Sequence, residues 1–211
     1  MTIANRQTTA NTQSAGAANA QTGIARILLA RHATPDWNRH DIPYDIPPGP
    51  PLTATGEREA LALGAFMHTQ GIVRVYHSPL ERTKRTAQLA VSVCGAELIE
   101  SYAIAEWRHD EAEDAMLARV LTLYEKAAHE SLAIGPIAIV THGGPVLSTL
   151  GHLGAASAEI NHYRSQFDHR NPLPPAGAWL GTRHNEAQAW NLRLVFAPNP
   201  IQPFLPDMAF V

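Results

Sequence analysis

The sequence is poor in several features that mark common classes of protein. It has a single cysteine, Cys94, which excludes an internal disulfide and a cysteine-based zinc site. No apolar run approaches the ~20 residues of a membrane-spanning helix, and residues 1–22 lack the apolar core of a secretory signal. The formal net charge is −3, so no overall positive field would attract nucleic acid or an anionic membrane. We therefore expect a cytoplasmic protein with neither partner.

Length and composition favour one folded domain. The chain has 211 residues, of which 45% are hydrophobic and 17% charged, as in ordinary globular proteins. Residues 1–22 are rich in Ala, Thr, Asn and Gln without apolar periodicity, which predicts a disordered N-terminal tail. Residues 23–211 are expected to form the domain, with an irregular end after residue 198. The oligomeric state stays open, and a homodimer is among the options.

The pattern of apolar residues is that of an α/β protein. Short runs typical of buried strands lie at 25–31, 73–78, 97–102 and 136–142. Helical patterns lie between and after them, at 53–71, 78–93, 111–131 and 143–154. Two last runs, 176–183 and 189–196, indicate a hairpin. We predict a three-layer α/β sandwich with a mostly parallel central sheet flanked by helices and a C-terminal edge hairpin.

Two of these helices have recognisable start signals. Ser78, Pro79 and Glu81 fit the N-cap, first and third positions of a capping box. Asp110 fits the N-cap of the helix that follows it. Both signals predict helices that begin with a side-chain cap.

Polar side chains follow the predicted strands at the points where they end. Arg31 and His32 follow the first run, Ser78 the second and His142 the fourth, and Glu106 comes shortly after the run at 97–102. In an open parallel sheet the carboxyl ends of the strands share one edge, and ligands bind outside it. These residues are therefore expected to converge.

Arg82 lies in the first turn of a predicted helix, with Lys84 and Arg85 close behind. Cations complement the C-terminus of a helix rather than its N-terminus. A solvated face explains Lys84 and one arginine. A bound anion would explain the other arginine, because free N–H groups and a guanidinium together bind phosphate. The glycine turn after His142 opens a second helix N-terminus of the same kind.

Metal ligation finds little support in the sequence. The chain has eleven histidines, but the H-E-x-x-H pattern of zinc enzymes is absent. His40, His109 and His162 could be ligands in principle, yet nothing around them supports that role. We expect neither a metal nor a cofactor.

Four spaced segments resemble one known family. They are "ARHATPDWN", "PLTATGEREA", "SPLERTKRTAQ" and "IVTHGGPV", at 30–38, 51–60, 78–88 and 139–146. In this order they resemble the motifs of the histidine phosphatase superfamily, also called the phosphoglycerate mutase-like family. The resemblance extends over about residues 24–196. It implies that function depends on a phosphorylated histidine.

The resemblance also implies roles for individual residues. His32 matches the nucleophile that becomes phosphorylated. Arg31, Arg82 and His142 match the clamp on the phosphoryl group, and Asn38 matches a lesser member of it. Ala33 stands where the family usually has glycine.

Glu106 matches the general acid and base of the family. The common G-x-W-E-G stretch after this acid is missing, so Asp110, Glu111 and Glu113 are rivals for the role. Glu111 and Glu113 complement the dipole of the helix that begins there. Glu106 lies in an apolar stretch that would raise the pKa of its carboxyl group, which favours it as the acid.

The expected function is hydrolysis of a small phosphorylated metabolite through phosphohistidine. A phosphoglycerate-mutase-type phosphotransferase is the alternative, but the short segment between Glu106 and His142 leaves little material for a lid. A non-catalytic phospho-ligand or protein-binding module is a third option. Specificity is expected from segments 39–51, 107–115 and 161–177. Substrate contact and a solvated loop are equally open for four residues there: Tyr44, Tyr163, Arg164 and Arg170.

Overall fold

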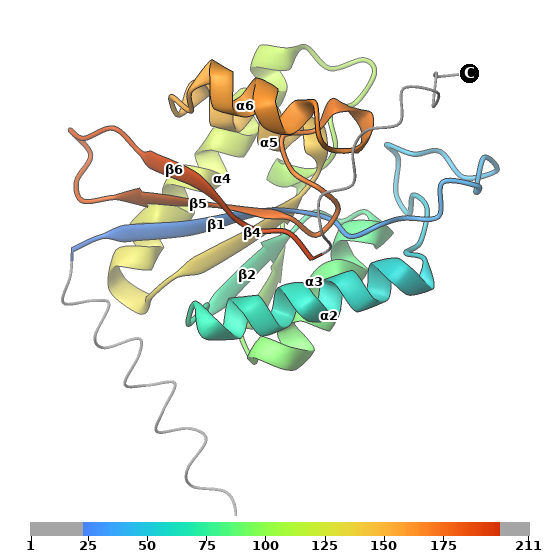
Figure 1. The fold of residues 1–211 in the computed structure, drawn as a ribbon, viewed down its shortest axis with the longest axis horizontal. Coiled ribbons are helices and arrows are strands. Elements are labelled where there is room, and N and C mark those ends of the chain that lie inside the picture. The colour runs from blue at the N-terminus through green and yellow to red at the C-terminus, as the bar shows by residue number, and fades with distance from the viewer. Residues whose placement is uncertain (1–22, 199–211) are drawn as a thin grey trace, which may run out of the picture.

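A six-stranded sheet forms the centre of the computed structural model, which describes residues 23–198 (Figure 1). The strands are β1 (Ala25–Arg31), β2 (Arg74–His77), β3 (Glu97–Glu100), β4 (Ile137–Thr141), β5 (Ala178–Arg183) and β6 (Asn191–Phe196). Their order is β3-β2-β4-β1-β5-β6. The first four in this order pair in parallel, and β5 and β6 add antiparallel pairs at one edge. The predicted mostly parallel sheet with an edge hairpin is confirmed.

Helices cover both faces of the sheet (Figure 1). On one side lie α2 (Ala54–Thr69) and α3 (Glu81–Cys94). On the other side lie α4 (Glu113–Ile134), α5 (Gly143–His152) and α6 (Ser157–Arg164). Two short 3₁₀ turns, η1 (Tyr102–Ile104) and η2 (Asp168–Arg170), complete the described elements. The predicted three layers are confirmed, while the predicted tail 1–22 and the end after residue 198 lie outside the described residues.

The side chains of β1 point alternately to the two faces of the sheet and contribute to two separate hydrophobic cores. Ile27 and Leu29 belong to the core beneath α4, whereas Leu28 and Ala30 belong to the core beneath α2 and α3. Successive side chains of a strand point to opposite faces, so a strand buried on both sides is apolar throughout. Burying one such large side chain contributes roughly 1.5–3 kcal/mol. The two cores therefore hold the strand ends, and the polar residues after them, in place.

Helices α2 and α3 approach each other most closely at Gly64. A Cβ atom there would lie 2.6 Å from the carbonyl oxygen of Ala90 and 2.8 Å from its Cα. We expect Gly64→Ala to lower the free energy of unfolding by about 1–3 kcal/mol, because the helices must separate. Denaturant unfolding measures it. Gly151→Ala in α5 is the matched control, since its Cβ would meet no atom within 4 Å and alanine favours a helix. A Gly64→Ala protein as stable as the wild type would contradict the close packing.

Both predicted helix caps are wrong. Helix α3 begins at Glu81, and Leu80 at its N-cap makes no side-chain capping bond. Ser78 instead lies 2.8 Å from His142, through its Oγ and the Nε2 of the histidine. Helix α4 begins at Glu113 after Ala112, so Asp110 is not its cap. In the first case the helix begins three residues after Ser78, whose hydroxyl accepts from the N–H of Leu80 at 3.4 Å as well as contacting His142.

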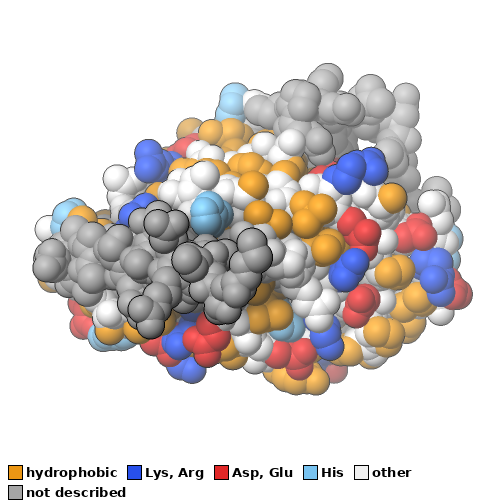
Figure 2. Space-filling model, turned by 90° about the horizontal axis from the view of Figure 1, so that it is seen from below, with side chains coloured by type: hydrophobic (Ala, Val, Ile, Leu, Met, Phe, Trp, Pro, Cys, Tyr) orange, Lys and Arg blue, Asp and Glu red, His pale blue; other side chains and the backbone are white. Residues whose placement is uncertain are grey.

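No helix within residues 23–198 is long and apolar enough to cross a membrane. Figure 2 shows the face that includes α2 and α3, seen from below. Acidic and basic side chains are interspersed on the part of this face that is visible.

Candidate active site

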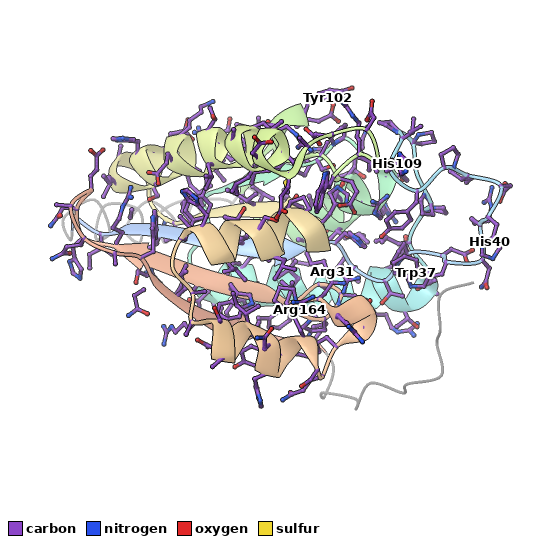
Figure 3. All side chains as sticks on the ribbon, turned by 90° about the horizontal axis from the view of Figure 1, so that it is seen from above. Arg31, Trp37, His40, Tyr102, His109 and Arg164 are labelled. Carbon is purple, nitrogen blue, oxygen red and sulfur yellow. The ribbon has the colours of Figure 1, made fainter. Side chains whose placement is uncertain are left out.

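Three neighbouring strands end at the same edge of the sheet and carry polar residues there. Strands β1, β2 and β4 are adjacent and parallel, and His32, Ser78 and His142 follow their last residues. The ring centroids of the two histidines are 5.4 Å apart, and both side chains are buried. Figure 3 shows Arg31 inside the molecule at this end, with Trp37 and His40 further out. The structure thus brings together the groups expected at the carboxyl edge.

His32 has one ring nitrogen that carries a proton and one that keeps its lone pair. Its Nδ1 lies 2.8 Å from the carbonyl oxygen of Ala33. A carbonyl can only accept, so Nδ1 carries the proton and Nε2 keeps its lone pair. Burial, and then the charges of Arg82 and Arg31, hold the pKa of His32 well below its ordinary 6.5. The imidazole is therefore neutral at neutral pH, which is the nucleophilic form.

Tyr44, in the loop after β1, contacts Nε2 of His32. Its hydroxyl is 3.3 Å from Nε2 of His32. The ring stacks on Trp37 at 5.3 Å, and the guanidinium of Arg82 lies 3.9 Å from its centre. Burial raises the pKa of Tyr44 to about 12, so the hydroxyl keeps its proton and can donate to Nε2. A phosphoryl group that reaches Nε2 has to take the place of this hydroxyl.

Arg82 is fully buried at the start of α3 and is only partly hydrogen-bonded. One terminal nitrogen donates to the carbonyl of Tyr44 at 2.6 Å, and the other donates to Oε2 of Glu106 at 3.1 Å. Its Nε has no hydrogen-bond partner among the described residues. A buried donor without a partner is costly, and an anion in the site would satisfy it.

His142 also has an unsatisfied ring nitrogen. Its Nε2 lies 2.8 Å from Oγ of Ser78, and its Nδ1 has no partner with hydrogen-bond geometry in residues 23–198. The serine hydroxyl can donate to Nε2, which leaves a proton on Nδ1 for an acceptor in the site. Burial, and then Arg82, lower the pKa of His142 well below 6.5. His142 is thus a neutral hydrogen-bond group rather than a cation.

Glu106 is the carboxylate that the structure brings to these residues. Its Oε2 lies 3.1 Å from Arg82 and 3.4 Å from Nδ1 of His142. Burial raises the pKa of its carboxyl group above the ordinary 4.5, and the charge of Arg82 opposes this shift. Arg119 of α4 fixes the segment, because it donates to the carbonyl of Glu106 and to two carbonyls just before it.

The three rival carboxylates have other surroundings. Glu111 forms a two-bond ion pair with Arg119, whose hydrogen bonds lower the pKa of the glutamate. The side chain of Asp110 is 79% exposed and pairs with Arg108. Glu113, in the first turn of α4, accepts a hydrogen bond from Ser148 of α5. None of these contacts involves His32, His142 or Arg82.

Two other predicted binding residues fit the site differently. Arg31 is buried at the end of β1 and forms a two-bond ion pair with Asp168, which the sequence did not indicate. Asn38 is exposed, and its backbone N–H donates to Asp36. No hydrogen bond links the Asn38 side chain to the other described site residues, so its role stays a prediction.

Segments expected to set specificity line the outside of the site. A surface depression of about 500 Å³ lies between loop 39–51 and segment 107–115, and its lining residues are Asp45, Ile46, Arg108, His109 and Asp110. In the third segment, Tyr163 packs edge-on against Trp179 and Arg164 donates to the carbonyl of Arg170. The first two segments are therefore better placed to contact a ligand than Tyr163 is.

No group of three or more histidine, cysteine or carboxylate side chains within residues 23–198 could hold a metal ion. The converging groups are instead two arginines, two neutral histidines and one carboxyl group of raised pKa. Such a set matches a phosphoryl group, whose oxygens need several donors around them.

Comparison with known sequences also points to phosphoryl chemistry. Residues 27–130 match the family model described as the histidine phosphatase superfamily, branch 1. The chain is 36% identical over 86 residues to a protein named probable phosphoglycerate mutase GpmB from Serratia proteamaculans. The aligned stretch covers 39% of this chain and 38% of that protein. A protein of the same name from Salmonella typhi is 32% identical over 83 residues, with the same coverage. The match thus spans well under half the length of these relatives.

Solved structures extend the likeness to the whole fold. A phosphoglycerate mutase from Bacillus anthracis superposes with a TM-score of 0.68 at 12% identity, covering 85% of this chain and 96% of that one. A mycobacterial glucosyl-3-phosphoglycerate phosphatase gives a TM-score of 0.62 at 16% identity, covering 82% and 99%. At these identities the likeness concerns the fold alone. Residues 27–130, which match the histidine phosphatase superfamily in sequence, include Arg31, His32, Arg82 and Glu106, and the fold of the chain is similar to that of these structures.

Proposed function

We propose that this protein hydrolyses phosphomonoesters of small metabolites through a phosphohistidine at His32. The observation that carries the proposal is the state of His32, whose neutral ring keeps an unprotonated Nε2 in contact with the Tyr44 hydroxyl, while two other buried groups carry donors without a partner among the described residues. Arg82 contributes Nε and His142 contributes Nδ1 to that set. Donors that await negative charge stabilise a transferring phosphoryl group as it spreads charge over its oxygens.

The first half-reaction transfers the phosphoryl group to the enzyme. The lone pair on Nε2 of His32 attacks phosphorus, and the bond between phosphorus and the ester oxygen breaks. The neutral carboxyl group of Glu106 gives its proton to the departing alkoxide, which leaves as an alcohol. Arg31, Arg82 and His142 hold the phosphoryl oxygens.

The second half-reaction restores the enzyme. Water attacks phosphorus while the carboxylate of Glu106 takes one of its protons, and the P–N bond breaks. The products are inorganic phosphate and His32 with a free Nε2. One carboxyl group with a raised pKa can serve both halves, because it is neutral when substrate arrives and ionised when water attacks.

A phosphoglycerate-mutase-type transferase is the second candidate, because relatives in sequence and in fold bear that name. A mutase must return the phosphoryl group to a product before water takes it. Between Glu106 and His142 the chain forms one helix of 22 residues, α4, and one strand, β4, with short connections. This leaves little chain for a lid, which supports hydrolysis.

A non-catalytic phospho-ligand or protein-binding module is the third candidate. Nucleic acid and membranes are not among the partners we propose. A binding module needs donors but no nucleophile. The unprotonated Nε2 of His32 and the raised pKa of Glu106 therefore favour an enzyme. The substrate's alcohol portion would lie against the depression between Asp45 and Arg108.

A substrate panel tests the proposal. An aryl phosphate, several phosphorylated metabolites and 3-phosphoglycerate are assayed by kcat/KM in excess chelator, and inorganic phosphate and any isomerised product are both quantified. We expect release of phosphate that survives chelation, because no described cluster can hold a metal. Isomerisation without phosphate release would favour the mutase, and no turnover at all would favour a binding module. Activity that is lost to chelator and restored by a divalent metal would contradict the metal-free mechanism.

A further inference from the structure

Asp168 holds one end of the Arg31 guanidinium. The two terminal nitrogens of Arg31 donate to the two carboxylate oxygens at 2.7 and 2.8 Å. Arg31 is 2% exposed, whereas the side chain of Asp168 is 34% exposed. Burial alone would lower the pKa of Arg31, but the charge and hydrogen bonds of Asp168 raise it. A buried arginine at the active site is thus compensated by a residue from a distant part of the chain.

This contact determines which N–H groups of Arg31 stay available. A guanidinium has five N–H groups arranged in a planar fork. Asp168 takes one from each terminal nitrogen, and the carbonyl of Leu173 lies 3.4 Å from Nη1. The remaining donors include Nε–H and the second N–H of Nη2, which lie parallel on one side of the fork. Such a pair binds two phosphoryl oxygens at once.

The segment that carries Asp168 is anchored rather than loose. Phe167 beside it is buried and stacks on Tyr163. The backbone N–H and side-chain amide of Asn171 both donate to the carbonyl of Asp168. The Asn171 side chain also fills the space beside Gly143, at the start of α5, where a Cβ would overlap it. The ion pair therefore belongs to a packed wall of the site.

We infer that Asp168 is a positioning residue, which turns the side edge of the Arg31 fork, Nε–H and Nη2–H, toward the phosphoryl group. The inference rests on the proposed function, because it assigns Arg31 to the phosphoryl group. The same geometry has an opposite reading, in which the carboxylate imitates two phosphate oxygens and competes with the ligand for Arg31. The anchoring of the segment favours positioning, since a competitor must leave when the ligand binds.

The experiment compares Asp168→Asn with the wild type by two measurements, kcat/KM for an aryl phosphate and the affinity for orthovanadate by calorimetry. Asparagine has almost the same shape but offers one acceptor in place of two. We expect both quantities to fall about tenfold to a hundredfold, the usual cost of releasing a positioned active-site group. Glu125→Gln is the matched control, because Glu125 pairs with both terminal nitrogens of Arg183, and neither quantity should change.

A double-mutant cycle of Asp168 and Arg31 separates positioning from a purely structural role, because only positioning makes the effect of Asp168→Asn on vanadate affinity depend on Arg31. If Asp168 acts through Arg31, Asp168→Asn should change vanadate affinity less than about threefold in an Arg31→Gln background. Equal losses in both backgrounds would overturn the inference, and so would tighter vanadate binding by Asp168→Asn. Asp168→Glu keeps the charge and should retain more affinity than Asp168→Asn. If Asp168→Asn fails to fold, an Asp168→Glu protein that binds no vanadate would also overturn it.

The two proposals fail in different ways. A wild-type protein that binds vanadate but releases no phosphate from any ester would contradict the proposed hydrolysis. The vanadate affinities of the four proteins in the cycle would still decide the role of Asp168.

Discussion

His32→Ala should lower kcat by about 10⁴-fold or more and abolish phosphoryl labelling of the protein. The reason is that the covalent route disappears with its nucleophile, and the remaining donors can only stabilise direct attack by water. The measurements are steady-state turnover of an aryl phosphate and incorporation of labelled phosphate at neutral or alkaline pH, where phosphohistidine survives.

His77→Ala is the matched control for this variant. His77 also lies at the end of a strand, is buried, and places its Nδ1 2.8 Å from the carbonyl of the next residue, Ser78. It differs in its surroundings, because the ring of His32 lies 5.4 Å from that of His142 and 3.3 Å from the Tyr44 hydroxyl. Turnover by His77→Ala should stay within about tenfold of the wild type. Turnover that survives in His32→Ala would contradict the mechanism, and equal losses in both variants would point to a structural cause.

Glu106→Gln should lower kcat for an alkyl phosphate by about 10²–10⁴-fold, the usual contribution of a general acid. The amide keeps the shape of the side chain but cannot protonate the alkoxide. For a nitrophenyl phosphate, whose leaving group barely needs a proton, the loss should be much smaller. If hydrolysis of the phosphohistidine becomes limiting instead, the phosphorylated protein should accumulate.

The pH dependence follows from the same carboxyl group. Because burial raises the pKa of Glu106, the acid form persists above pH 4.5, and activity on alkyl phosphates should fall as pH rises through the raised pKa. Glu106→Gln should flatten this fall. His32 has a pKa well below 6.5, so its protonation should limit activity only at lower pH.

Neighbouring carboxylates provide the controls. Asp110→Asn alters an exposed ion pair and should leave kcat nearly unchanged. Glu111→Gln weakens the hold of Arg119 on the segment that carries Glu106, so a moderate loss is expected. If Glu106→Gln stays near wild type on an alkyl phosphate while either control collapses, the acid is that neighbour.

Local patterns were enough to predict most of the fold. The buried strands β1 and β4 are apolar throughout, and the helices between strands show their periodicity, so each element is visible in a short window of sequence. The convergence of His32, Ser78 and His142 then follows from a general property of parallel sheets. Neither step needs knowledge of tertiary contacts.

Two of the differences from the structure concern contacts between distant residues. Ser78 looks like a helix cap, but its hydroxyl lies against His142, 64 positions away. Asp168 is 137 positions from Arg31, and nothing near it in sequence marks it as a partner. Helix α6 was missed because its eight residues bury one large side chain, Ile160, and show little periodicity. Such pairings arise only from packing, which a single sequence does not display.

The most direct test of the central claim is to locate the phosphoryl group on the trapped enzyme. Substrate is mixed with the wild-type protein, which is then denatured in alkali and examined by phosphorus NMR and peptide mass spectrometry. The geometry predicts phosphate on Nε2 of His32, because Nδ1 of that ring is held by the carbonyl of Ala33. Phosphate on Nδ1 of His32, phosphate on His142, or a protein that turns over without any label would contradict the account.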